Sequence, residues 1–138
     1  MPLADPTRLQ ASANADPEFR LAARYWNATL SLESPPHALR VEIADGQVAS
    51  CQASTAGEPA TVTVVASEAG WAQFLAPLPR PFYQDLLGGC VQHHGFEVAG
   101  DILSLSAYYG ATQRLFAVMR ALRASTALAG GRASGEGR

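Results

Sequence analysis

The sequence predicts an α+β fold in which helices cover one face of a mainly antiparallel five-stranded sheet. Of its 138 residues, 48% are apolar and 16% are charged, as in a globular domain with a sizeable core. An Asp-Gly pair at 45–46 separates two segments of alternating apolar and polar residues, which is the signal of a β-hairpin. Near the C-terminus, Leu115, Val118, Met119 and Leu122 follow helical spacing and predict an amphipathic helix. Strands followed by helices in this order favour a layered α+β architecture.

The first predicted elements are a helix and a strand. The helix begins at Asp16, a favoured N-cap residue, and Pro17 suits the first helical position because its missing N–H would have no helical partner there. Apolar residues then recur at helical spacing as far as Trp26. Beyond it the period changes to two, so Leu30 and Leu32 predict a strand with one buried face.

Three further strands follow in close succession. Residues 37–44 alternate most clearly, residues 47–54 return after the Asp-Gly turn, and residues 60–66 follow a second turn rich in Gly and Pro. Because short connections join successive strands, we expect neighbours along the chain to pair antiparallel.

Helices resume in the second half of the chain. Ser67 is the expected N-cap of a helix that the proline-rich segment 77–81 stops. A short helix is expected over 82–87, ended by two glycines, and a last strand over 96–101 precedes the final helix. We assign Asp101 to the cap of the segment that follows it.

Both ends of the chain have the composition of tails. Residues 1–15 lack clear periodicity, and residues 124–138 consist mainly of Gly, Ala, Ser and Arg. Such segments bury little apolar surface, so we expect flexible tails at both ends and one folded domain over 16–123.

Charge and cysteine content exclude several classes of protein. The formal net charge is -2, and all ten cations are scattered arginines, which does not suit a nucleic-acid-binding surface. No apolar run approaches the roughly 20 residues of a membrane span. Two cysteines cannot build a disulfide framework or a four-cysteine zinc site. We therefore expect a cytoplasmic protein that binds no nucleic acid and has no integral membrane span.

Three motifs, in this order, resemble the sterol carrier protein family of small lipid-binding and sterol-transfer domains. The first is a Leu-x-Val-x-Ile strand before the Asp-Gly turn, over 39–46. The second is the Trp-bearing helix Ser-Glu-Ala-Gly-Trp-Ala-Gln-Phe-Leu at 67–75. The third is Phe-Glu-Val-x-Gly-Asp at 96–101, followed by an apolar helix that includes 115–120. The resemblance spans about residues 16–123.

The resemblance implies an apolar tunnel between the sheet and the helices, where members bind fatty acids, fatty acyl-CoA or sterols. In this chain, aromatic and aliphatic side chains on several helical segments are the candidates for lining it. A solid core made of the same side chains is the alternative interpretation. The candidate ligand-binding residues are Trp71, Phe74, Leu78, Phe82, Tyr83, Leu87, Tyr108, Tyr109, Phe116 and Met119.

Residue types that carry catalysis gather in one segment, which contains Cys90, His93, His94, Glu97 and Asp101. A structural zinc site needs four ligands, and no second pair stands at suitable spacing, so we expect no metal. His93 and His94 could act in acid–base catalysis, because an imidazole pKa near neutrality suits that role. Histidines of a surface loop are the simpler interpretation.

The sequence therefore predicts a lipid-binding module that needs no cofactor and has no catalytic residues of its own. The alternative is a small enzyme that acts on a hydrophobic polyketide, terpenoid or steroid-like substrate through His93 and His94. A third interpretation is an accessory protein that docks on a partner enzyme, and a homodimer also remains open.

Overall fold

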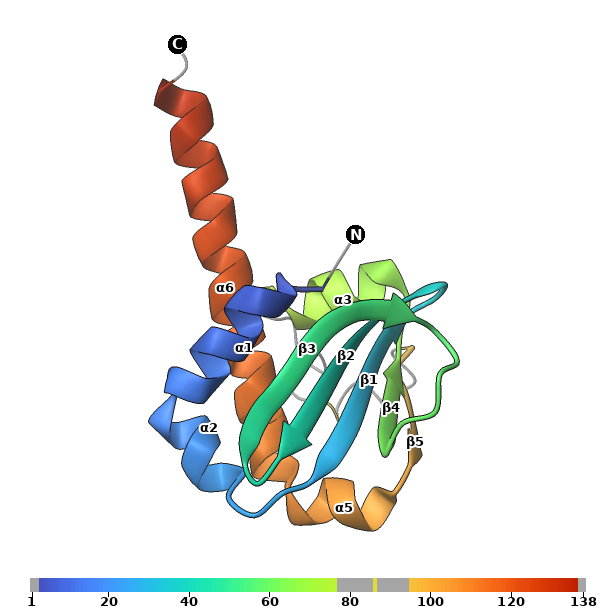
Figure 1. Ribbon diagram of the computed structural model, residues 1–138. Helices are drawn as coiled ribbons and strands as arrows, with labels where there is room; N and C mark the ends of the chain where they lie inside the picture. The colour runs from blue at the N-terminus through green and yellow to red at the C-terminus, as the bar shows by residue number, and fades with distance from the viewer. Residues whose placement is uncertain (1–2, 77–85, 87–94, 137–138) are drawn as a thin grey trace.

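The computed structural model describes residues 3–76, 86 and 95–136 of the chain. It contains a five-stranded sheet and, within the described residues, five helices (Figure 1). In chain order the elements are α1 (Pro6–Ala15), α2 (Pro17–Ala22), β1 (Ala28–Ser34), β2 (His37–Ala44), β3 (Gln47–Thr55), β4 (Val62–Val65), α3 (Glu68–Phe74), β5 (Glu97–Gly100), α5 (Ile102–Ala107) and α6 (Tyr109–Glu136).

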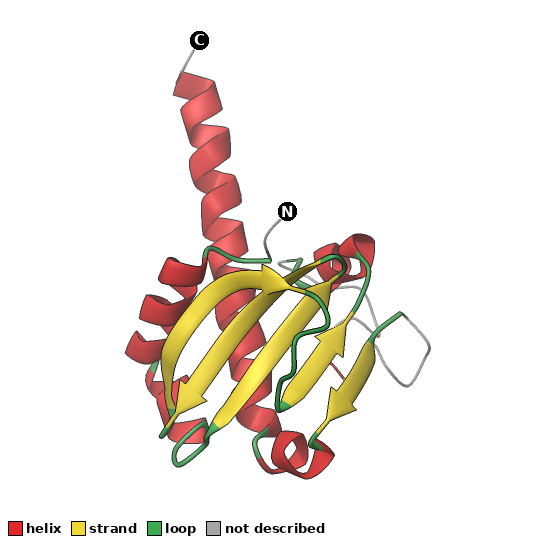
Figure 2. Ribbon diagram, turned by 45° about the vertical axis from the view of Figure 1, so that its right-hand side comes forward, coloured by secondary structure: helices red, strands yellow, loops and turns green. Residues whose placement is uncertain are grey.

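The sheet has the strand order β3-β2-β1-β4-β5, and α1, α3 and α6 lie on one of its faces (Figures 1 and 2). Leu30 and Leu32 of β1 point into the core formed between these helices and the sheet. Strand β1 is central and nearly buried along its whole length, because helices cover one of its faces and the chain after β3 crosses the other. The predicted α+β class with helices over one face is confirmed.

The sheet is mixed, and the prediction that successive strands all pair antiparallel is wrong for β4. Strand β4 lies beside β1 and runs parallel to it, with Leu30 opposite Val62 and Leu32 opposite Val64. The Gly- and Pro-rich segment after β3 is therefore the start of a crossover, although its composition predicts a tight turn. In this position Val62 and Val64 are buried in the core.

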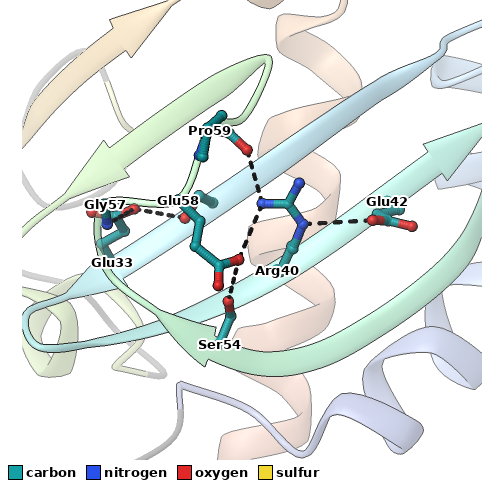
Figure 3. A network of polar contacts seen from close by, with 8 residues as sticks. Glu33, Arg40, Glu42, Ser54, Gly57, Glu58 and Pro59 are labelled. Carbon is teal, nitrogen blue, oxygen red and sulfur yellow. Dashed lines mark hydrogen bonds and ion pairs between the residues drawn. The ribbon is translucent and has the colours of Figure 1, made fainter.

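Polar contacts fix this crossover on the sheet face away from α6 (Figure 3). The buried carboxylate of Glu33 accepts hydrogen bonds from the Ser31 hydroxyl at 2.7 Å and from the Gly57 backbone N–H at 3.2 Å. Arg40 donates to the Pro59 carbonyl at 2.9 Å. The buried charge thus has partners, as a buried carboxylate requires.

The predicted caps and the predicted turn are confirmed. Asp16, Ser67 and Asp101 each accept a backbone N–H of the helix that follows, and so satisfy donors that have no partner in the first helical turn. Asp45 and Gly46 adopt φ values of 50° and 77°, the left-handed pair that a two-residue hairpin turn needs.

At the N-terminus the structure differs from the predicted tail over residues 1–15. Helix α1 is capped by Asp5, and its Leu9 and Ala13 are fully buried. The Asn14 side chain accepts the Val48 N–H at 2.8 Å and donates to the Val48 carbonyl at 3.0 Å. Two apolar positions one turn apart are only a weak sequence signal for a helix. The hydrogen bonds between Asn14 and the edge strand β3 also stabilise the helix there, and no sequence pattern reveals them.

The C-terminal region also differs from the prediction. Helix α6 continues to Glu136 through the predicted tail at 124–138, and its last part extends away from the sheet (Figure 1). The alanines of this segment favour a helix, although its glycines do not. The predicted helix stop at 77–81 and the short helix at 82–87 lie outside the described residues, except that Leu86 is helical and fully buried.

Candidate functional site

Four aromatic rings form the centre of the helical side of the core. Trp71 and Phe74 of α3 contact Phe96 and Phe116, with ring centroids 4.9–6.1 Å apart. Several of these contacts are edge-to-face, an arrangement that adds to the energy of burial. The Trp71 indole N–H donates to the Glu33 carbonyl of β1 at 2.8 Å, so this aromatic cluster is tied to the sheet.

Arg120 of α6 holds the C-terminal end of α3 against this cluster. Its Nε and Nη2 both donate to the Phe74 carbonyl, at 3.0 and 2.6 Å, and its guanidinium lies over the Phe74 ring at 5.3 Å. Burial lowers the pKa of Arg120. A guanidinium still remains charged at physiological pH, and it satisfies a carbonyl that has no partner within the helix.

A pocket of about 420 Å³ lies beside the aromatic cluster, between β5, α5 and the start of α6. It is partly open, and most of its wall is apolar. Phe96 belongs both to this wall and to the aromatic cluster, so the pocket borders the rigid core directly. The described residues that line it are Leu86, Phe96, Val98, Ile102, Leu105, Ser106 and Tyr109.

Helix α5, one wall of the pocket, is fixed to the rest of the molecule by Trp26. The Trp26 and Tyr108 rings stack with centroids 5.0 Å apart and an angle of 10° between their planes. The Trp26 indole N–H also donates to the Ser104 hydroxyl at 3.0 Å. Asp101 caps the helix at its other end. Both ends of α5 are therefore held.

The structure separates the predicted ligand-binding residues into three groups. Tyr109 lines the pocket. Tyr108 stacks on Trp26, and a further four residues are buried in the core: Trp71, Phe74, Phe116 and Met119. The remaining four lie outside the described residues: Leu78, Phe82, Tyr83 and Leu87. The candidate acid–base residues His93 and His94, together with Cys90, also lie outside them.

Sequence reasoning missed most of the pocket wall, although a signal for it exists. Ile102, Leu105, Ser106 and Tyr109 follow the i, i+3, i+4, i+7 spacing of one helical face. Phe96, directly before β5, and Val98 within it are two residues apart, the spacing of residues on the same side of a strand. The sequence prediction considered mainly aromatic residues and therefore did not include the aliphatic residues Val98, Ile102 and Leu105.

Titratable groups in the described part of the chain do not form a metal-binding cluster. No three His, Cys, Asp or Glu side chains within it lie close enough together to hold a metal ion. Burial, with a smaller contribution from the negative charge of Asp5, raises the pKa of the Cys51 thiol to about 12. The protonated thiol is a poor nucleophile near neutral pH. None of the helices within these residues has the length and apolarity to cross a bilayer.

Comparisons with known proteins identify the fold. No family model and no curated protein matches the sequence. Among solved structures, sterol carrier protein 2 superposes with a TM-score of 0.69 at 22% identity, over 86% of this chain and 97% of that protein. A conserved hypothetical protein from Thermus thermophilus, named as a possible sterol carrier protein, gives 0.65 at 22% identity, over 88% of this chain and 90% of that one.

The UbiJ-SCP2 ubiquinone synthesis protein is more distant, with a TM-score of 0.54 at 18% identity, over 83% of this chain and 90% of that protein. All three comparisons cover most of both chains, so they concern the whole domain and not one motif. The resemblance that the sequence motifs indicate is thus confirmed, and the chain has the fold of sterol carrier protein 2.

Proposed function

We propose that this protein binds a lipid-like ligand in the pocket between β5, α5 and α6, and carries or presents it. The pocket itself is the observation that supports the proposal most strongly. Its volume of about 420 Å³ lies within the range of roughly 300–1,000 Å³ that is typical of small-molecule sites. Its wall is aliphatic and aromatic, and Ser106 and Tyr109 supply the hydroxyl groups.

The chemistry of the wall favours a ligand with a long apolar part. Each methylene group that leaves water for such a wall contributes about 0.8 kcal/mol, so a segment of an acyl chain or a fused ring system suffices for measurable affinity. The ligand classes that fit are a fatty acid, a fatty acyl-CoA or a sterol. Two of the structural neighbours carry names that refer to hydrophobic molecules, a sterol and ubiquinone, which supports the same class.

The pocket walls are organised before a ligand arrives. The contacts of Trp26 with Ser104 and Tyr108 hold α5, and the aromatic cluster holds Phe96. Walls that are ordered in advance lower the entropic cost of binding. A ligand therefore binds without a large rearrangement of these walls.

A substitution at Val98 tests the proposal, with Val65 as its matched control. Val98 lines the pocket, whereas Val65 lies on the adjacent strand, opposite Glu97 in register, and does not line it. Val98→Phe should weaken binding of the fluorescent fatty acid cis-parinaric acid at least tenfold, because the added ring fills the pocket. Val65→Phe makes the same change in size outside the pocket and should leave the affinity within twofold.

Thermal unfolding of both variants shows whether each one folds. Equal binding by the two folded variants, or no binding by the wild-type protein, would contradict the proposal. Native mass spectrometry of the purified protein is a second test, in which a bound lipid should appear as a discrete mass increment.

A further inference from the structure

The large apolar side chains that the described residues expose most strongly all lie at one end of the molecule. Leu103 is 84% exposed, Tyr25 70%, Leu21 68% and Ile102 50%. Leu21 belongs to α2, Tyr25 to the loop that follows it, and the other two to α5. Figure 1 shows α2, this loop and α5 along one end, away from the end where the last part of α6 extends. We call this surface the α5 end.

The two halves of the α5 end are joined by direct contacts. Trp26, the neighbour of Tyr25, stacks on Tyr108 and donates its indole N–H to Ser104 of α5. Ile102 is half exposed and also lines the pocket. Ile102 therefore connects the exposed apolar side chains with the pocket wall.

Arginine side chains lie among these apolar groups. Arg20 and Arg24 are exposed, and neither forms an ion pair with any described residue. The Arg24 guanidinium lies over the Tyr25 ring at 5.2 Å. Arginine beside an exposed tyrosine matches the boundary between phosphate headgroups and acyl chains, because the cation contacts phosphate and the ring tolerates both environments.

The turn closed by the Trp26 N–H and the Ala23 carbonyl places Tyr25 in a left-handed backbone conformation that does not call for a bulky side chain. The Tyr25 φ of 71° lies in the left-handed region, which is uncommon for a bulky residue and is usually occupied by Gly or Asn after a helix. A glycine there would relieve the strain. An exposed aromatic ring kept at a strained position indicates a role outside folding.

We propose that the α5 end docks on the surface of a lipid bilayer, with Leu103, Ile102 and Tyr25 inserted at the headgroup level. This inference rests on the proposed function, since it brings the mouth of the lipid pocket to the membrane from which a ligand would come. A bilayer fits better than a protein partner. The Arg24–Tyr25 pair beside exposed aliphatic side chains has the composition of a membrane-interface anchor, in which the cation contacts phosphate and the ring lies at the headgroup level.

Sedimentation with vesicles of equimolar phosphatidylcholine and phosphatidylglycerol tests the proposal. The wild-type protein should bind them, and Leu103→Ser should weaken binding about tenfold, because it removes one inserted aliphatic side chain. Leu103 does not line the pocket, so this variant should bind cis-parinaric acid like the wild-type protein. Vesicle binding can therefore fail while ligand binding succeeds, and the two proposals fail separately.

Tyr25→Gly separates membrane docking from folding. It removes the inserted ring and also relieves the left-handed backbone, so it should weaken vesicle binding severalfold without lowering the melting temperature. If Tyr25 had only a structural role, Tyr25→Gly would lower the melting temperature and leave vesicle binding unchanged.

A tryptophan probe locates the inserted surface. Leu103→Trp places an indole at the α5 end, and its emission should shift to the blue when vesicles are added. Gln52→Trp places the same probe at an exposed position of β3, as the matched control, and should show no shift. Equal vesicle binding by the wild-type protein and Leu103→Ser would overturn the proposal. So would a dimer, seen by analytical ultracentrifugation, that Leu103→Ser dissociates, because the surface would then be a protein interface.

Discussion

Asp16 connects two helices through one carboxylate. Oδ1 accepts the Glu18 N–H at 3.0 Å as the N-cap of α2, and Oδ2 accepts from Arg114 Nε of α6 at 2.7 Å. Burial acts to raise the pKa of Asp16, but the hydrogen bonds from Arg114 and from backbone N–H groups outweigh it and lower the pKa below 3.8. The ionised carboxylate therefore stabilises the folded state.

The pH dependence follows from the direction of this shift. A carboxyl group whose pKa is lower in the folded protein contributes stability above its unfolded value of 3.8, and loses it as the pH falls through the folded pKa. Asp16→Asn retains a capping oxygen and removes the charge. It should lower the free energy of unfolding near neutral pH by about 0.5–1 kcal/mol, because Arg114 is partly exposed and screened by solvent.

Urea unfolding of both proteins over a range of pH measures this contribution. The difference between the wild-type protein and Asp16→Asn should vanish in acid. Glu18→Gln is the control, since Glu18 lies 3.4 Å from Arg114 but is far more exposed, and it should change stability little. A difference for Asp16→Asn that stays constant in acid would show that charge is not the cause.

Residue-scale features are the part of this protein that sequence predicts best. The caps Asp16, Ser67 and Asp101 and the Asp45-Gly46 turn depend on local chemistry, so neighbouring residues suffice to identify them. Asn14 is the counterexample, because its partner is the backbone of Val48, far away in sequence. No local pattern reveals such a contact.

At the scale of elements, the corner between β5 and α5 shapes the pocket. Gly100 has a φ of 106°, and a Cβ at this position would collide with the Thr61 carbonyl. The next residue, Asp101, donates its N–H to the same Thr61 carbonyl at 2.8 Å and then caps α5. This close approach of two backbones sets where α5 leaves the sheet, and so where the pocket wall stands.

Gly100→Ala should destabilise the protein by about 3 kcal/mol, since it combines an unfavourable φ with a backbone clash. Gly57→Ala is the matched control. Its φ of 94° is similarly unfavourable, but nothing lies within 4 Å of the added Cβ, so its cost should be about 1 kcal/mol.

Chemical denaturation of the two variants isolates the effect of the clash from that of the backbone angle. Equal losses of stability would mean that the corner tolerates a side chain and that Gly100 does not set the position of α5. A larger loss of stability for Gly100→Ala than for Gly57→Ala would support the conclusion that the β5–α5 corner positions α5.

The pairing of strands is a feature that the local sequence does not predict. The alternation of β4 in the sequence identifies it as a strand but contains no information on its neighbour. Its pairing with β1 depends on the crossover that Arg40 and Glu33 fix on the far face of the sheet (Figure 3). Long-range polar contacts of this kind become visible only in three dimensions.

At the scale of the whole molecule, the pocket borders the core and shares wall residues such as Phe96 with it. Trp71, Phe74, Phe116 and Met119 are buried in the core, whereas the pocket lies between β5, α5 and α6. The sequence predicts that an apolar layer exists between helices and sheet. It does not predict which apolar side chains meet and which leave space, since that depends on how far α5 and α6 stand from β5.

The most direct test of lipid binding in this pocket is an isotope-filtered nuclear Overhauser experiment with carbon-13-labelled oleic acid bound to the protein. Contacts from the acyl chain to the methyl groups of Val98, Ile102 and Leu105 are the predicted result. The methyl groups of Leu39 and Val48, on the β2–β3 side of the core, should show none. Contacts confined to Leu39 and Val48, or no contact with any of the five residues, would contradict the account.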